Sequence, residues 1–258
     1  MYHKLDIDAR GVATVTITRA DKHNAFNEDL IRELTDTFLY IERSENVRVV
    51  VLTAEGESFC AGADLNWMSR MKDFSYEENL ADSKKLSDLF TVINACPYPV
   101  IGRMNGHALG GGAGLLACCD YVVAVDTALV GFTEVKLGLV PAVISPFVVA
   151  KIGEGQARAT FLNGEKFNTQ KALSMGLVHK ITTKSELDNE IKSIVDSFLT
   201  AAPKATVLAK SLIKNIVKLN SITAARDYTC EVISKVRTEV EAQEGMSALL
   251  EKRKPKWI

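Results

Sequence analysis

Alternation of apolar and polar residues over Val12 to Thr18 predicts a half-buried strand. A second strand is predicted at Val47 to Thr53, where a nearly continuous valine-rich run is typical of burial on both faces. Between them, Asn27 is suited to cap a helix. The apolar residues of that helix follow a period of about 3.6 residues, and they are Leu30, Ile31, Leu34, Phe38 and Ile41. The chain thus opens with a strand, a helix and a buried strand.

The same alternation of strands and helices continues along the chain. It predicts a helix over Leu80 to Ile93, a strand at Pro99 to Met104, a helix after a glycine triplet and a strand at Asp120 to Val125. Such a pattern indicates an α/β fold of stacked right-handed crossover units. Only helices are predicted near the end, at Leu187 to Leu199, Lys204 to Val217 and Thr223 to Glu241. We expect an α/β core over residues 1–200 and a helical oligomerisation region over 201–258.

Composition narrows the range of partners. The chain has 258 residues, 47% hydrophobic and 24% charged, as in ordinary globular proteins. Its net charge of -1 gives no electrostatic argument for nucleic acid or an anionic membrane. The five cysteines include no CxxC pair, which disfavours a metal site and a disulfide framework. We expect a cytoplasmic protein, because no apolar run approaches the roughly 20 residues that span a bilayer.

The glycine triplet Gly110, Gly111 and Gly112 lies where a strand gives way to a helix. Glycine costs a helix about 1 kcal/mol relative to alanine, so three in a row require a reason. One reason is close approach of a ligand to free backbone N–H groups at a helix start. The sequence around the triplet is not a Walker A loop, because no Gly-Lys-Ser/Thr follows it. It is not GxGxxG either, because residue 115 is leucine where the third glycine would fall. Nucleotide cofactors held by those loops are therefore disfavoured.

A second glycine motif and a lone glutamate complete the candidate chemistry. The motif runs from Phe59 to Met68, a short distance after the buried strand predicted at Val47 to Thr53. A single glycine-rich turn of this kind more often serves backbone geometry alone. Two such turns, however, could direct their free N–H groups at one oxygen and form an oxyanion hole. Each donor of such a hole can stabilise the transition state by about 3 kcal/mol or more. Glu134 has the apolar neighbours Phe132 and Val135. An apolar environment raises the pKa of a carboxyl, which suits proton transfer near neutrality.

Three segments together resemble the crotonase (enoyl-CoA hydratase/isomerase) superfamily. They are Cys60-Ala-Gly-Ala-Asp64, Asn105-Gly-His-Ala-Leu-Gly-Gly-Gly112 and Thr133-Glu-Val-Lys-Leu-Gly138. The resemblance extends from Arg19 to Pro255, essentially the whole chain. It implies a spiral of ββα units, a C-terminal helical region that mediates trimers, commonly paired into hexamers, and an acyl-CoA thioester as substrate. It implies no cofactor beyond the coenzyme A of that substrate, and no metal.

The resemblance also assigns roles to individual residues. The backbone N–H groups of Ala63 and Gly111 would bind the thioester oxygen as it becomes an enolate. Two segments would bind coenzyme A, represented by Lys22, His23, Ala25, Ala61, Asp64 and Leu65. The basic cluster at Lys252, Arg253, Lys254 and Lys256 is either a phosphate contact for a neighbouring subunit or a solvated tail.

One position departs from the family pattern. Hydratases of this family usually carry two glutamates, and the first would fall at Gly114, while the second is Glu134. Hydration uses a base and an acid, so either Glu134 serves both steps or an unidentified residue replaces the first. A double-bond isomerisation needs a single base. Under the two-acid model, Gly114→Glu is expected to restore a carboxylate and raise hydration of crotonyl-CoA.

A closer resemblance is to bacterial methylglutaconyl-CoA hydratase-like members, through Ala61 to Met68 and Leu137 to Pro146. It places Gly114, Trp67 and Val143 at the acyl pocket. Three candidates for binding a distal carboxylate are Arg70, Lys72 and Ser145. Three functions stay open: a hydratase of a branched enoyl-CoA, a single-glutamate 3,2-enoyl-CoA isomerase, and a non-catalytic relative that binds coenzyme A or RNA.

Overall fold

The computed structural model describes residues 1–219 and 221–258, and its framework is two sheets. The larger sheet has the order β1-β2-β3-β5-β7-β10, and all of its pairs are parallel except β1 with β2. Its strands are β1 (His3–Ile7), β2 (Val12–Ile17), β3 (Val49–Ala54), β5 (Val100–Met104), β7 (Tyr121–Val125) and β10 (Lys180–Thr182). The smaller sheet has the order β4-β6-β8-β9, with strands β4 (Ser58–Cys60), β6 (His107–Leu109), β8 (Leu129–Gly131) and β9 (Lys166–Asn168).

The chain alternates between the two sheets. Strands β3, β5 and β7 of the larger sheet are followed directly by β4, β6 and β8 of the smaller one, and helices come next. These helices and their neighbours are α1 (Glu28–Glu42), α2 (Leu65–Met71), α3 (Tyr76–Ala95), α4 (Gly111–Cys118), α5 (Ser145–Phe161), α6 (Thr169–Ser174) and α7 (Leu187–Leu199). This repetition is the spiral of ββα units that the family resemblance implied, and that prediction is confirmed.

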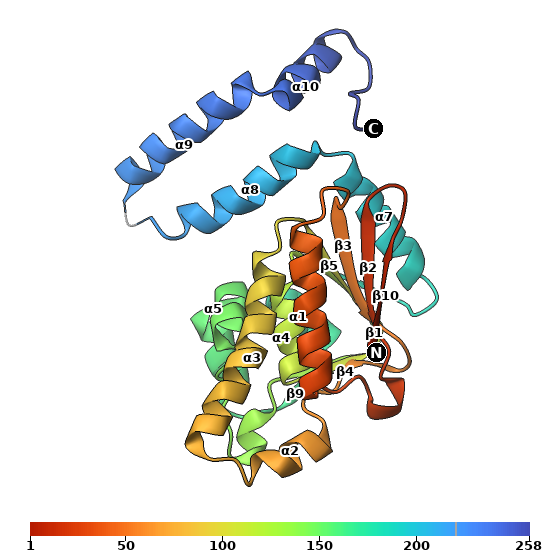
Figure 1. The fold of residues 1–258 in the computed structure, drawn as a ribbon, viewed down its shortest axis with the longest axis vertical. Coiled ribbons are helices and arrows are strands. Elements are labelled where there is room, and N and C mark those ends of the chain that lie inside the picture. The colour runs from red at the N-terminus through yellow and green to blue at the C-terminus, as the bar shows by residue number, and fades with distance from the viewer. Residues whose placement is uncertain (220) are drawn as a thin grey trace.

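The core lies between the larger sheet and its helices. All six residues of β3 are buried, as the valine-rich run predicted. Helices α1 and α3 pack side by side (Figure 1), and α7 contacts β3, β5 and β7. Asn27 caps α1 by accepting a hydrogen bond from the Leu30 N–H, and the five predicted apolar positions of this helix are buried. Cys60, Cys96, Cys118 and Cys119 are also buried.

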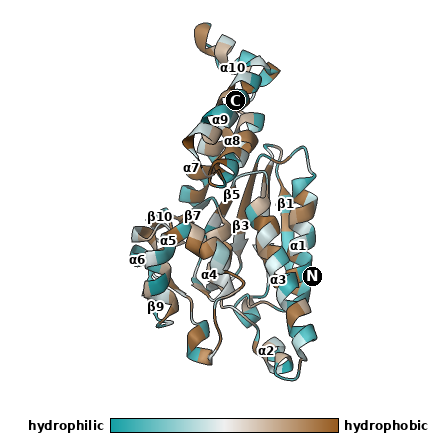
Figure 2. Cartoon of the chain, turned by 90° about the vertical axis from the view of Figure 1, so that its left-hand side faces the viewer, coloured by the Kyte–Doolittle hydropathy of each residue, from teal (hydrophilic) through white to brown (hydrophobic). Residues whose placement is uncertain are grey.

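Three helices extend beyond this core, as Figures 1 and 2 show: α8 (Pro203–Ile216), α9 (Ile222–Thr238) and α10 (Val240–Leu250). The prediction of one helix from Thr223 to Glu241 is wrong, because Glu239 is extended (ψ 149°) and separates α9 from α10. No glycine or proline marks the break. The chain beyond it returns to the core, where the Trp257 indole N–H donates to the Thr200 carbonyl at 3.2 Å. Such a long-range contact leaves no local signal in the sequence.

Two cationic side chains attach the C-terminal region to the core. The Arg48 guanidinium donates to the carbonyls of Leu199, Ala201 and Trp257. The Lys210 ammonium on α8 contacts the Asp120 carboxylate at 2.6 Å, just before β7. Among the helices of the described residues, none is long and apolar enough to cross a membrane.

Candidate active site

The loops that follow β4 and β6 meet at one point. These strands are parallel neighbours, with Cys60 opposite Ala108, so both loops leave the same edge of the smaller sheet. A Cβ atom added to Gly62 would lie 3.2 Å from the Leu109 carbonyl oxygen. One added to Gly110 would lie 4.0 Å from the Gly62 Cα. The structure therefore brings the two glycine motifs of the sequence into contact.

Ala63 offers a backbone donor at this point. The Phe26 N–H donates to the Gly62 carbonyl at 2.7 Å, and the Asp64 N–H donates to the Phe26 carbonyl at 2.8 Å. In a parallel pairing of this kind, the residue between the two bonded groups directs its own N–H to the other side. The Ala63 N–H makes no hydrogen bond within the described chain, so it is free to bind a ligand.

Gly111 offers the second donor, as the first residue of α4. Its N–H also has no acceptor among the described residues, as expected at a helix start, where the dipole favours negative charge. A Cβ at Gly111 would lie 2.9 Å from the Phe26 ring, so a larger residue would displace this helix end. Gly110 before it takes φ +52°, a conformation that favours glycine.

Glu134 faces the same loops from the start of a 3-10 turn (Glu134–Leu137) after β8. Its Oε1 would lie 3.3 Å from a Cβ placed on Gly110. Its Oε2 is buried and has no hydrogen-bond partner in the described chain. Burial raises the pKa of this carboxyl above its ordinary value. A carboxylate that is short of partners and held beside two free N–H groups is arranged to exchange a proton with a bound molecule.

The position of the missing glutamate is filled by an apolar side chain. A Cβ at Gly114 would lie 2.4 Å from Ile144 Cγ2 and 3.1 Å from the Phe90 ring. Phe90 in turn packs against Phe147, with ring centroids 6.0 Å apart. The expectation that Gly114→Glu would simply restore an acid is therefore wrong, because Ile144 occupies the space that such a side chain needs.

The predicted coenzyme A segments lie side by side. The Ala61 N–H donates to the His23 carbonyl at 3.0 Å, which joins the loop of Lys22, His23 and Ala25 to the loop after β4. Lys22 is exposed, and Leu65 is 81% exposed at the start of α2. Asp64 differs from these residues, because its carboxylate is buried against Arg19.

The predicted acyl-pocket and carboxylate-binding residues are more dispersed. Trp67 is buried, and its indole N–H has no hydrogen-bond partner among the described residues. Val143 packs on the core. Arg70 is paired with Glu28 at 2.6 Å. The remaining two candidates are Ser145, which donates to the Ala142 carbonyl, and Lys72, which is exposed after α2.

The C-terminal basic cluster lies near α10, at the opposite end of the molecule from α2 and β4 (Figure 1). Arg253 contacts Glu244 at 2.6 Å and Glu251 at 2.7 Å, and its hydrogen bond lowers the pKa of Glu244 to about 2. Within one protomer this cluster does not meet the site.

Two residues at the site had no predicted role, Arg19 and Ile144. The signal for Arg19 was an arginine directly after a strand, and its partner Asp64 is an N-cap residue before a helix. For Ile144 the signal was general: the segment Ala142 to Ser145 stands where the family resemblance implies a glycine-rich stretch, but nothing in the sequence indicated a contact with Gly114.

The contact between Gly114 and Ile144 predicts different costs for two glycine-to-alanine changes. Gly114→Ala is expected to destabilise the protein by about 1–3 kcal/mol, because the added methyl group overpacks the core. Gly155→Ala in α5 is the matched control: a Cβ there meets nothing within 4 Å, so a change between neutral and a gain of about 1 kcal/mol is expected. Urea unfolding measures the free energy of unfolding of both variants. Equal changes in the two variants would show that Ile144 moves aside without loss of stability.

Comparison with known proteins identifies the family of this chain. The enoyl-CoA hydratase/isomerase family model matches residues 8–258. A short-chain-enoyl-CoA hydratase from Clostridium acetobutylicum is 32% identical, covering 94% of this chain and 92% of that protein. A crotonyl-CoA hydratase from Syntrophomonas wolfei is 31% identical, covering 96% of this chain and 94% of that protein. The crystal structure of an enoyl-CoA hydratase from Shewanella pealeana has a TM-score of 0.95 and 37% identity, covering 100% of this chain and 96% of that one. The chain therefore belongs to the enoyl-CoA hydratase/isomerase family, the crotonase superfamily that its motifs resemble.

Proposed function

We propose that this protein adds water to an α,β-unsaturated acyl-CoA. The observation that carries the proposal is the buried, unpartnered Oε2 of Glu134 beside a junction where two backbone N–H groups are free. The names of the relatives, which include crotonyl-CoA and short-chain-enoyl-CoA hydratases, support the same chemistry.

In the proposed mechanism the thioester oxygen accepts hydrogen bonds from the Ala63 and Gly111 N–H groups. Glu134 takes a proton from water while the oxygen of that water bonds to the β-carbon, and the electron pair of the double bond moves onto the thioester as an enolate. The two donors stabilise this charge, each contributing about 3 kcal/mol. Protonated Glu134 then returns its proton to the α-carbon, which restores the thioester carbonyl. Ile144 takes the place of a second acid, so the mechanism assigns both proton transfers to Glu134.

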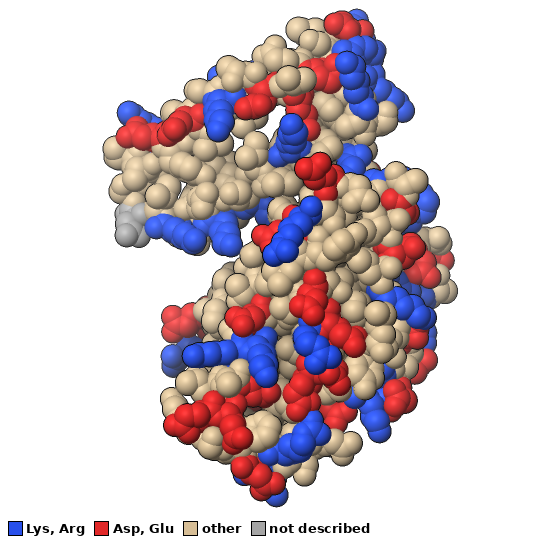
Figure 3. Space-filling model, viewed as in Figure 1, with Lys and Arg blue, Asp and Glu red and all other residues tan. Residues whose placement is uncertain are grey.

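The substrate class is inferred from the relatives and the motifs. The names of the relatives, crotonyl-CoA and short-chain-enoyl-CoA hydratases, support a short acyl chain, and the resemblance of residues 61–68 and 137–146 to methylglutaconyl-CoA hydratase-like proteins makes 3-methylglutaconyl-CoA the branched candidate. Coenzyme A is part of the substrate, and no further cofactor is required. Charges of both signs are interspersed over the face in Figure 3, which offers no argument for a nucleic-acid partner. An isomerase is the second candidate, since one carboxylate suffices to move a proton between two carbons.

Turnover of three thioesters tests the proposal. The wild type is expected to hydrate crotonyl-CoA or 3-methylglutaconyl-CoA, and Glu134→Gln is expected to lower kcat by about 10²- to 10⁴-fold, because the amide cannot carry the proton. Glu45→Gln, at an exposed position of the loop after α1, is the control and is expected to keep full activity. Loss of absorbance of the conjugated thioester measures the reaction. Activity that survives in Glu134→Gln contradicts the assigned role, and turnover of a 3-enoyl-CoA alone identifies the isomerase.

The raised pKa of Glu134 also predicts a pH-dependent stability. The folded protein holds this proton more tightly than the unfolded chain, whose glutamate pKa is about 4.3. The cost of ionising the buried carboxyl is therefore absent below the unfolded pKa and fully present above the folded pKa. Glu134→Gln removes that cost, so its Tm is expected to exceed that of the wild type at about pH 8 and to match it at about pH 4. Glu45→Gln is expected to show no such gain, and a Tm gain in Glu134→Gln that is equal at both pH values would contradict the argument.

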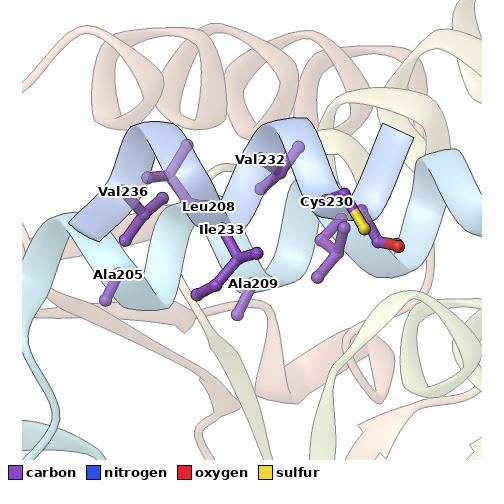
Figure 4. A pocket seen from close by; sticks show the side chains of 9 residues that line it. Ala205, Leu208, Ala209, Cys230, Val232, Ile233 and Val236 are labelled. Carbon is purple, nitrogen blue, oxygen red and sulfur yellow. The ribbon is translucent and has the colours of Figure 1, made fainter. Parts of the chain in front are cut away.

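We also propose that helices α8 to α10 mediate a homo-oligomer, a trimer or a dimer of trimers. None of the residues of α8 or α9 is buried in one protomer. Apolar side chains line a groove of about 390 Å³ between these two helices (Figure 4), among them Leu208, Val232 and Ile233. Ile213 on α8 and Leu250 on α10 are also exposed. Apolar side chains exposed in this number on three helices are typical of a protein–protein interface.

Light scattering of charge variants tests the assembly. The wild type is expected to have three or six times the mass of one chain. Ile213→Glu combined with Leu250→Glu is expected to shift the protein toward monomers, because both charges would be buried in the interface. Tyr40→Glu introduces a charge at an exposed apolar residue of α1 and is expected to leave the mass unchanged. A monomeric wild type would contradict the proposal.

A further inference from the structure

A buried ion pair lies next to the Ala63 donor. Arg19, just after β2, and Asp64, just before α2, are in contact at 2.9 Å, and each side chain is 8% exposed. Burying two charges is costly unless their remaining hydrogen-bonding atoms are also satisfied. The use of such a pair at this place therefore calls for a reason beyond stability.

The remaining atoms of the pair bind the segments around the site. The second arm of the Arg19 guanidinium donates to the Ala25 carbonyl, and the Arg19 backbone N–H donates to Asn24 Oδ1. Asn24 is fully buried and donates to the carbonyls of Glu55 and Ser58, on either side of the turn before β4. Arg19 thus fixes the loop of residues 19–26 to the segment that leads into the oxyanion loop.

Asp64 fixes the other side of the donor. Its Oδ1 accepts from the Asn66 N–H at 2.8 Å and caps α2, while Oδ2 accepts from Arg19. Burial opposes ionisation, but the hydrogen bonds from Arg19 and the α2 N–H groups lower the pKa of the Asp64 carboxyl below its usual value. The carboxylate stays charged and holds both partners at once.

The Ala63 peptide lies between these two fixed points. Its neighbours Gly62 and Asp64 are bonded to the backbone of Phe26, which belongs to the loop that Arg19 holds. Gly62 takes φ +96° and has no side chain whose packing could fix the orientation of the Gly62–Ala63 peptide. We propose that Arg19 and Asp64 are positioning residues that set the direction of the Ala63 N–H, and that their ion pair tunes the affinity of the site for an enolate over a neutral thioester. This inference rests on the proposed oxyanion hole, whose donors act only when held within a narrow geometry.

The test compares two coenzyme A thioesters, one whose acyl group is an anionic enolate and one whose acyl group is neutral. Acetoacetyl-CoA ionises to an enolate, whereas butyryl-CoA carries the same coenzyme A and a neutral thioester. Asp64→Asn keeps the helix cap but loses the charge. It is expected to weaken the binding of acetoacetyl-CoA by about 10- to 100-fold by calorimetry while the Kd of butyryl-CoA changes little. Because both ligands share the coenzyme A loop, the ratio of the two affinities reports the hole alone.

Two further variants separate positioning from folding. Asp120→Asn weakens the half-buried pair with Lys210 outside the site, and is expected to lower Tm while the affinity ratio stays at the wild-type value. The double variant Arg19→Met with Asp64→Asn leaves no unpaired buried charge. If Asp64→Asn alone does not fold, the ratio of the affinities for acetoacetyl-CoA and butyryl-CoA is measured in this double variant. An unchanged ratio in a folded Asp64 variant overturns the inference. A wild type that binds the enolate tightly but hydrates no enoyl-CoA overturns the proposed function and leaves this inference standing.

Discussion

Cys60 pairs with Ala108 in a parallel register, and the chains that leave β4 and β6 consequently emerge at one edge of the smaller sheet. Everything at the site depends on how closely those chains approach. A Cβ at Gly112 would lie 2.2 Å from the Cys60 carbonyl, and one at Gly106 would lie 1.9 Å from the Glu57 carbonyl. Backbone packs directly on backbone here, so glycine is required before any ligand is considered. The same closeness brings the Ala63 and Gly111 loops together.

Burial and charge pairing determine the electrostatics of the site. Burial raises the pKa of the Cys60 thiol to about 12, so this group stays neutral beside the loops. Arg19 and Asp64 cancel each other's charge, and the donors that face the ligand are uncharged peptide groups. Charge that appears on a bound oxygen would therefore be met by fixed dipoles that need no reorganisation. Glu134, with its raised pKa and unpartnered oxygen, supplies the mobile proton of the proposed reaction.

The sequence predicted the parts of this structure that local pattern controls. Long elements such as α1, β3 and α7 were placed within two residues, because periodicity and the Asn27 cap are local. The three-residue strands of the smaller sheet were missed, since three residues give no period. Helix α4 begins at Gly111 inside the triplet rather than after it, because packing on Cys60 and Phe26 overrides the low helix propensity of glycine. Of the site, the glycine loops and Glu134 were foreseen through motifs. The contacts of Ile144 and Arg19 depend on residues 30 to 45 positions away in the chain, which no local pattern encodes.

Gly114 and Ile144 form one unit in this fold. A glutamate at position 114 cannot be accommodated while Ile144 Cγ2 stands 2.4 Å from the site of its Cβ, and removal of Ile144 alone would leave a void against Phe90. Either single change loses packing, so an acid at position 114 requires a coordinated change at Ile144. The space beside Gly114 is therefore apolar in this chain. In the proposed mechanism both proton transfers consequently rest on Glu134.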